Sequence, residues 1–148
     1  MLTEDRLDLL AIAPRYAAAV DARELATATA LFAGDAVLVV PDPPRTQTPV
    51  LEHHGHEAIS AALAQVTSVE LTLHEIVGQV VEAGPTATEA RGHVRCVAHH
   101  VTGEQDVVWR LHYEDSYERG AEGWRIARRE LHLDLVEIRR VRPRVDHR

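Results

Sequence analysis

Lysine and asparagine are absent from this chain of 148 residues, and cysteine, methionine and phenylalanine occur once each. The single Cys96 excludes an internal disulfide, on which small secreted domains commonly depend. A polar segment, residues 3–6, closely follows Met1, where a secretory signal would place basic residues and then an apolar run. We therefore expect a cytoplasmic protein that folds without disulfide bonds.

Long apolar runs are also missing. The most apolar window, residues 17–33, is interrupted by Asp21, Arg23 and Glu24, so it does not predict a membrane-spanning helix. The formal net charge of -7 argues against a nucleic-acid-binding module, because binding to phosphates needs a basic face. We expect neither a membrane nor a nucleic acid as a partner.

The length is typical of one domain, which should bury roughly 70% of the surface that its unfolded chain exposes. Arginines gather from Arg139 to the last residue, and such an end is typical of a solvated tail. We expect one domain over residues 1–140 and a basic tail over residues 141–148.

The N-terminal half carries three helical patterns and one strand. Apolar residues follow helical spacing after Thr3, which suits an N-cap, and Pro14 should kink this first helix. Gly34 ends the second helical pattern, and Gly55 precedes the third. The predicted elements are helices over residues 3–20, 22–32 and 56–65 and a strand over residues 36–40, which a proline-rich loop follows as far as Pro49.

The C-terminal half alternates strand-like runs with turn residues, as an antiparallel meander does. Helices in one half and strands in the other indicate an α+β fold rather than an alternating α/β fold. We expect about three helices to close a cone-shaped, curved antiparallel sheet around one central pocket. The predicted strands are residues 69–81, 87–101, 106–117 and 124–138.

Four short motifs lie along the chain. Residues 16–24 place a Tyr and an Asp before a small residue and an acid, and residues 31–36 read Leu-Phe-Ala-Gly-Asp-Ala. Residues 55–59 read Gly-His-Glu-Ala-Ile, and residues 123–129 read Gly-Trp-Arg-Ile-Ala-Arg-Arg. Their order and spacing resemble the SnoaL-like branch of the nuclear transport factor two superfold. The resemblance implies the fold but no single reaction, because enzymes and non-enzymatic binders share this superfold.

The resemblance also implies roles for three residues. In the scytalone-dehydratase-like and bile-acid-dehydratase-like members, a Tyr and an Asp spaced like Tyr16 and Asp21 bind substrate and orient a catalytic His. His74 lies where those members carry that His. Asp21 could hold the His74 imidazole in one tautomer, which would make a general base. Alternatively, Tyr16 only packs in the core, Asp21 caps the second helix and His74 is a structural strand residue.

A second catalytic histidine is either His99 or His100, which point to opposite faces of one strand. His100 shares its face with the apolar Val94 and Cys96, so strand alternation favours His100. The position relative to His74 in the dehydratase-like members favours His99, and a bulge could reconcile the two. We take His99 as the fourth catalytic residue.

The strand over residues 106–117 places Tyr113 and Asp115 on one face with Trp109, which is the expected lining of the cone. Buried polar groups need partners, either neighbouring side chains or a ligand. Arg129 could be the partner of Asp115 in a structural ion pair. We expect Tyr113, Asp115 and Arg129 to take part in substrate binding.

Ten histidines invite a metal-site hypothesis, but their spacing gives it little support. His53, His54 and His56 fall in a loop at a helix start, far from the only cysteine, so no zinc-like ligand set is evident. We expect no bound metal and no cofactor.

Two functions remain open from the sequence. One is a cofactor-free dehydratase, isomerase or cyclase that moves protons, with His74 as base, on a small hydrophobic molecule such as a polyketide- or steroid-like carbonyl compound. The other is a non-catalytic ligand-binding or scaffold domain of the same fold. Apolar residues on both faces of the predicted sheet also lead us to expect a homodimer.

Overall fold

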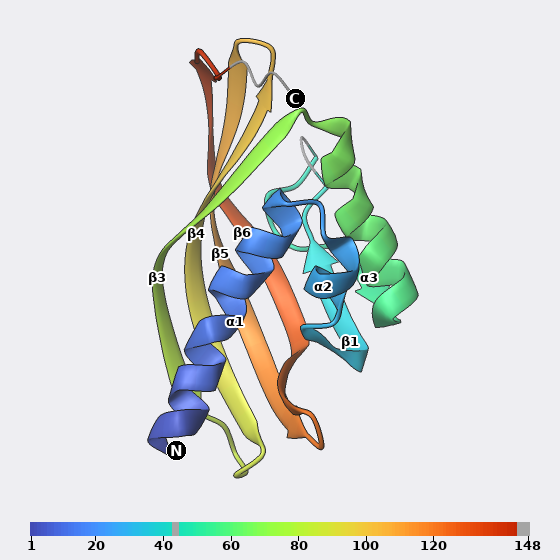
Figure 1. Ribbon diagram of the computed structural model, residues 1–148, viewed down its shortest axis with the longest axis vertical. Coiled ribbons are helices and arrows are strands. Elements are labelled where there is room, and N and C mark those ends of the chain that lie inside the picture. The colour runs from blue at the N-terminus through green and yellow to red at the C-terminus, as the bar shows by residue number, and fades with distance from the viewer. Residues whose placement is uncertain (43–44, 145–148) are drawn as a thin grey trace.

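The computed structural model describes residues 1–42 and 45–144 (Figure 1). Residues 145–148 of the predicted basic tail lie outside the described residues. The elements are α1 (Thr3–Asp21), α2 (Leu25–Thr29), β1 (Phe32–Val40), β2 (Leu51–His54), α3 (Gly55–Leu63), the 3-10 helix η1 (Ala64–Ser68), β3 (Leu71–Ala83), β4 (Glu89–Thr102), β5 (Gln105–Gly120) and β6 (Gly123–Arg140).

Six strands form one curved sheet in the order β2-β1-β6-β5-β4-β3. Strands β3 to β6 pair antiparallel with their neighbours in sequence, which confirms the predicted meander. β1 joins β6 in parallel and β2 pairs antiparallel with β1, so the sheet is mixed rather than wholly antiparallel. The sheet stays open, and the helices lie on one side of it (Figure 1). The predicted α+β class is confirmed.

Two local predictions differ from the structure. The second helix is only five residues long, because the turn that ends α1 continues to Glu24 and β1 already begins at Phe32. β2 was not predicted, since its four residues are mostly exposed and carry no alternating apolar pattern. Its backbone nevertheless pairs with β1 from Val37 to Val40.

Pro14 lies inside α1, and the structure shows how the helix tolerates it. Proline has no N–H, so the carbonyl of Leu10 loses its helical donor. The side-chain amide of Gln79 on β3 donates to that carbonyl with Nε2 and O 3.0 Å apart. A strand residue therefore satisfies the group that the proline leaves free.

The core lies between α1 and the concave face of the sheet. Leu9, Ile12, Tyr16 and Val20 recur at spacings of three or four and form the buried face of α1. They meet the inward side chains of β4, β5 and β6, which include Val94, Cys96, Leu111, Tyr113 and Leu133. None of the described helices is long and apolar enough to cross a membrane.

Candidate functional site

Asp21, the last residue of α1, holds His74 near the start of β3 through two hydrogen bonds. Nδ1 of the His74 ring lies 2.6 Å from Oδ1 of Asp21, and the backbone N–H of His74 donates to Oδ2 at 2.7 Å. An ionised carboxylate only accepts, so Nδ1 carries the proton and Nε2 of the neutral ring keeps its lone pair. Within the described residues, no hydrogen bond occupies Nε2, which is therefore the atom of the pair that can take a proton.

The surroundings of Asp21 favour its ionised form. Burial opposes the charge, but hydrogen bonds from the ring and backbone of His74 outweigh burial and hold the pKa of Asp21 below its ordinary value. The hydroxyl of the fully buried Thr72 also donates to Oδ1 of Asp21, at 3.2 Å. The side chains of His74 and Asp21 remain 9% and 22% exposed, so the pair lies at the edge of the core rather than inside it.

His100 of β4 adds a second imidazole on the same face of the sheet. The His74 and His100 ring centroids are 6.4 Å apart, and the His100 ring lies 5.0 Å from that of Trp109. Nδ1 of His100 donates to the carbonyl of Val107 at 2.9 Å. Burial lowers the pKa of His100, so the ring is neutral near pH 7 and its Nε2 is an acceptor.

His99 lies on the opposite face, which corrects its assignment as the fourth catalytic residue. Its Nδ1 is 2.6 Å from Oδ2 of Asp106, and its Nε2 is 2.8 Å from Oε2 of Glu75. The pairing of β4 with β5 runs without a register shift, so no bulge there turns His99 inward. His100, which strand alternation favoured, is the histidine that lies beside His74.

Tyr16 packs in the core rather than against the Asp21–His74 pair. Its ring meets those of Phe32 and Tyr113 edge-on, with centroids 6.1 Å apart in both cases. No hydrogen bond joins Tyr16 to Asp21 or His74 in the part of the chain that the structure describes. Burial raises the pKa of Tyr16 and of Tyr113, so both hydroxyls keep their protons.

Arg129 and Asp115 form a fully buried ion pair next to these rings. Nε and Nη2 of Arg129 donate to the two carboxylate oxygens of Asp115 at 2.8 and 2.7 Å, and the Tyr117 hydroxyl donates to Oδ2 at 2.9 Å. The guanidinium lies 4.5 Å from the centre of the Tyr16 ring and 4.0 Å from that of Tyr113. Burial opposes the charge of Arg129, but Asp115 outweighs burial and raises the pKa of Arg129.

The residues expected to bind substrate thus form a packed cluster. Tyr113, Asp115 and Arg129 are all buried, and the two charged side chains have no exposed surface. The structure brings Asp21 and His74 together as one pair and places Tyr16 with this core cluster instead. Asp115 and Arg129 form the ion pair that the sequence suggested, and their part in substrate binding stays a prediction.

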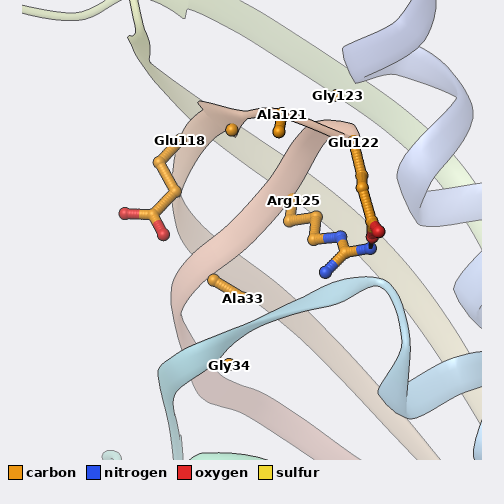
Figure 2. A pocket seen from close by; sticks show the side chains of 8 residues that line it. Ala33, Gly34, Glu118, Ala121, Glu122, Gly123 and Arg125 are labelled. Atoms are coloured by element: carbon orange, nitrogen blue, oxygen red, sulfur yellow. Dashed lines mark hydrogen bonds and ion pairs between the residues drawn. The ribbon is translucent and has the colours of Figure 1, made fainter.

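Three surface hollows lie away from the Asp21–His74 pair. Figure 2 shows one of them, between the β5–β6 turn and the start of β1, where Ala33, Gly34, Glu118 and Arg125 contribute to its lining. A second hollow lies at the first turn of α1. A third lies between the β4–β5 turn and the last residues of β6. Asp21, His74 and His100 line none of these three hollows.

Within residues 1–42 and 45–144, no group of three or more His, Cys, Asp or Glu side chains is arranged to hold a metal ion. His93, His112 and His132 do gather on the outer face of the sheet, but their rings stack at centroid distances of 5.0 and 4.7 Å. Stacked rings present their faces, not their nitrogen lone pairs, to one another. Burial raises the pKa of the Cys96 thiol to about 12, which leaves it unreactive.

Thr72 is a site residue that the sequence analysis did not identify. It precedes His74 by two positions in a strand, so both side chains emerge on the same face. The spacing of two was the sequence pattern that could have indicated Thr72. It does not show that Thr72 contacts Asp21, which is 51 positions away in the chain.

A family model described as the SnoaL-like domain matches residues 2–130 of the chain. No curated protein sequence matches this chain. The chain is similar in structure to three solved proteins from Novosphingobium aromaticivorans, all of which are less than 25% identical to it. Likeness at this level shows the fold alone.

The first of the three is provisionally named an aromatic ring hydroxylase; it is 19% identical, with a TM-score of 0.79 over 94% of this chain and 96% of that one. The second is provisionally named a scytalone dehydratase; it is 20% identical, with a TM-score of 0.73 over 98% and 100% of the two chains. The third is described as an NTF2-like protein with a cystatin-like fold; it is 18% identical, with a TM-score of 0.73 over 88% and 82%. These matches confirm the resemblance that the four sequence motifs indicated.

Proposed function

Because this chain belongs to the SnoaL-like domain family, we propose that it is a cofactor-free enzyme of the lyase, isomerase or cyclase type. Its substrate would be a hydrophobic, oxygenated small molecule such as a polyketide- or steroid-like carbonyl compound. The observation that supports this proposal is the Asp21–His74 pair, in which the carboxylate fixes the proton on Nδ1 and leaves Nε2 free. The name of the scytalone dehydratase-like neighbour is consistent with such chemistry but belongs to that protein.

In the proposed first step, Nε2 of His74 takes a proton from the carbon next to the substrate carbonyl. The electron pair of that C–H bond moves onto the carbonyl oxygen, which becomes an enolate. Asp21 stabilises the imidazolium that forms, because its carboxylate already accepts from Nδ1 at 2.6 Å. The side chains of His74 and Asp21 are 9% and 22% exposed, and the proposal requires a substrate to reach Nε2 from this exposed edge.

In the second step, the proton on Nε2 returns to the substrate. Transfer to a leaving hydroxyl gives dehydration, transfer to another carbon gives isomerisation, and transfer to a carbonyl oxygen during ring closure gives aldol cyclisation. His100 is proposed to accept a hydrogen bond from a substrate hydroxyl at its neutral Nε2. Tyr16 takes no part in this proposed step, because its ring packs against Phe32 and Tyr113 in the core, away from the Asp21–His74 pair.

A non-catalytic ligand-binding or scaffold domain is the second candidate function. The positions of the surface hollows favour it, because none of the three borders the Asp21–His74 pair. The core cluster also favours the non-catalytic function, because Asp115 and Arg129 form an ion pair with each other. In that case the Asp21–His74 pair would serve only to fasten the end of α1 to β3.

Product analysis separates the two functions. The wild-type protein would be incubated with a panel of hydroxy-ketones of polyketide and steroid type, and products would be identified by mass spectrometry. We expect loss of water, double-bond migration or ring closure with at least one compound, and a drop of about 10²-fold or more in His74→Ala. Binding of a compound without conversion would support the ligand-binding domain instead.

We further propose that the protein is a cytoplasmic homodimer. The outward side of the edge strand β3 exposes Leu73 and Val80, and the end of β6 exposes Leu135 and Ile138. Apolar side chains at such positions on a sheet are commonly covered by a second subunit.

A further inference from the structure

Arg23, two residues after the end of α1, has a backbone conformation that its residue type disfavours. Its φ is +61°, and it is the one non-glycine residue with a positive φ among residues 1–42 and 45–144. The backbone N–H of Arg23 donates to the Val20 carbonyl at 3.0 Å, and that of Glu24 donates to the Ala19 carbonyl at 2.8 Å. This pattern is the helix-ending motif that usually places glycine at the left-handed position. Backbone conformation alone would therefore favour glycine at position 23.

The side chain of Arg23 makes contacts that glycine could not make. Nη2 donates to the carbonyl of Val69 at 2.8 Å, just before β3. Nη1 donates to Oγ1 of Thr72 at 2.6 Å. The guanidinium thus reaches across to the strand that carries His74.

Thr72 connects this contact to the Asp21–His74 pair. Arg23 has no acceptor, so Oγ1 of Thr72 accepts from it and has its single O–H left to donate. That O–H is directed at Oδ1 of Asp21, 3.2 Å away, which is the oxygen that also accepts from Nδ1 of His74. Thr72 is fully buried, so water does not compete for its hydroxyl.

We propose that Arg23 and Thr72 are positioning residues that fix the Asp21 carboxylate and, through it, the tautomer of His74. The chain of hydrogen bonds runs from Arg23 to Thr72 to Asp21, where it meets the donor Nδ1 of His74. Neither positioning residue forms a hydrogen bond with the His74 ring. The inference deepens the proposed function and rests on it, since the tautomer matters for catalysis only if His74 is the base.

The test uses the full chain and NMR signals that need no substrate. Thr72→Val removes the hydroxyl at nearly constant shape, and Thr72→Ser restores it. Arg23→Gly removes the guanidinium and relieves the left-handed backbone, so a changed NMR signal in this variant would not result from backbone strain. Arg6→Ala is the matched control, because Arg6 also joins α1 to β3, through the Val81 carbonyl at 3.0 Å, but at the far end of the helix.

The readouts are the His74 ring nitrogen shifts, the solvent-exchange rate of its Nδ1 proton and the Asp21 carboxyl titration. We expect the Nδ1–H exchange rate to rise about tenfold or more in Thr72→Val and Arg23→Gly, the size that follows from losing one hydrogen bond to a charged group. The pKa of Asp21 should rise in Thr72→Val, because one of the hydrogen bonds that lower it is gone. Thr72→Ser and Arg6→Ala should both match the wild-type protein.

The outcomes distinguish this inference from the proposed function. Unchanged His74 and Asp21 signals in Thr72→Val and Arg23→Gly would overturn the positioning role, even if His74→Ala abolished turnover. Changed signals together with no turnover of any compound by the wild-type protein would retain the positioning role and remove the proposed catalysis. If Thr72→Val failed to fold, the His74 and Asp21 signals of Arg23→Gly would be compared with those of Arg6→Ala. Signals that change only in Arg23→Gly would support the positioning role, and signals unchanged in both would overturn it.

Discussion

His99 and His100 are adjacent in the chain, yet their imidazoles lie on opposite faces of β4 and their pKa values move in opposite directions. Burial disfavours the charged form of both rings. At His99 the hydrogen bonds to Asp106 and Glu75 outweigh burial and raise the pKa. At His100 burial prevails and lowers the pKa.

An NMR titration should therefore place His99 above the ordinary histidine value of 6.5 and His100 below it. Glu75→Gln removes a carboxylate from Nε2 of His99, so it should lower the pKa of His99 and leave that of His100 nearly unchanged. Coincident titration of the two rings would show that they share one environment, against the structure.

The two pKa shifts make the stability of the fold depend on pH in opposite directions. The raised pKa of His99 stabilises the protein below pH 6.5, and this contribution is lost as the pH rises through the folded value. The lowered pKa of His100 stabilises it above pH 6.5, and this contribution is lost as the pH falls through the folded value. Urea unfolding across this range should show a weaker acid dependence in His100→Gln than in the wild-type protein.

Arg129→Met should destabilise the protein strongly, because it leaves the charge of Asp115 buried without its partner. The expected loss is about 3–5 kcal/mol in the free energy of unfolding. The double variant Arg129→Met with Asp115→Leu removes both charges and should lose much less. Chemical denaturation of the two variants tests this, and equal losses would mean that the ion pair does not govern this part of the core.

Gly92 leaves space on β4 for the ring of Tyr117 on β5. A Cβ at position 92 would lie 2.6 Å from the Tyr117 hydroxyl oxygen and 2.7 Å from its Cε2. Gly92→Ala should therefore cost about 1–3 kcal/mol in the free energy of unfolding, as overpacked cores do. Gly120→Ala is the control, because no atom lies within 4 Å of the added Cβ. Thermal unfolding that left both variants unchanged would contradict the close packing at Gly92.

The proposed homodimer predicts a doubled mass in light scattering that persists on dilution. Val80→Glu should weaken the association, because it places a charge on the exposed apolar side of β3, where Val80 is 58% exposed. A monomer at every concentration would exclude the dimer.

The sequence predicted the parts of the fold that depend on local pattern. The four strands of the meander are separated by turn residues, and each strand lies within a few positions of its predicted bounds. β2 escaped prediction because its exposed residues carry no apolar alternation and its pairing with β1 is a tertiary contact. The tolerance of Pro14 depends on Gln79, which lies 69 positions away from the carbonyl it satisfies.

The candidate site was predictable only in part, because some of its contacts join residues far apart in the chain. The motif of α1 and the position of His74 indicated Asp21 and His74, whose side chains the structure brings into contact. Strand alternation favoured His100, and the choice of His99 gave precedence to a position transferred from other proteins. Thr72 and Arg23 become visible only when the end of α1 and the start of β3 are placed side by side.

Removal of a proton next to a carbonyl is the step that dehydration, isomerisation and aldol cyclisation share. Deuterium incorporation from D2O into a panel of cyclic ketones, followed by NMR, therefore measures the proposed chemistry whichever reaction follows. His74→Ala and Asp21→Asn test the base and its partner, and His112→Ala, on the outer face, is the control.

We predict exchange by the wild-type protein with at least one ketone, a rate about 10²-fold or more lower in His74→Ala, and an unchanged rate in His112→Ala. No exchange with any ketone, or an equal rate in His74→Ala, would contradict the role of His74 as the base.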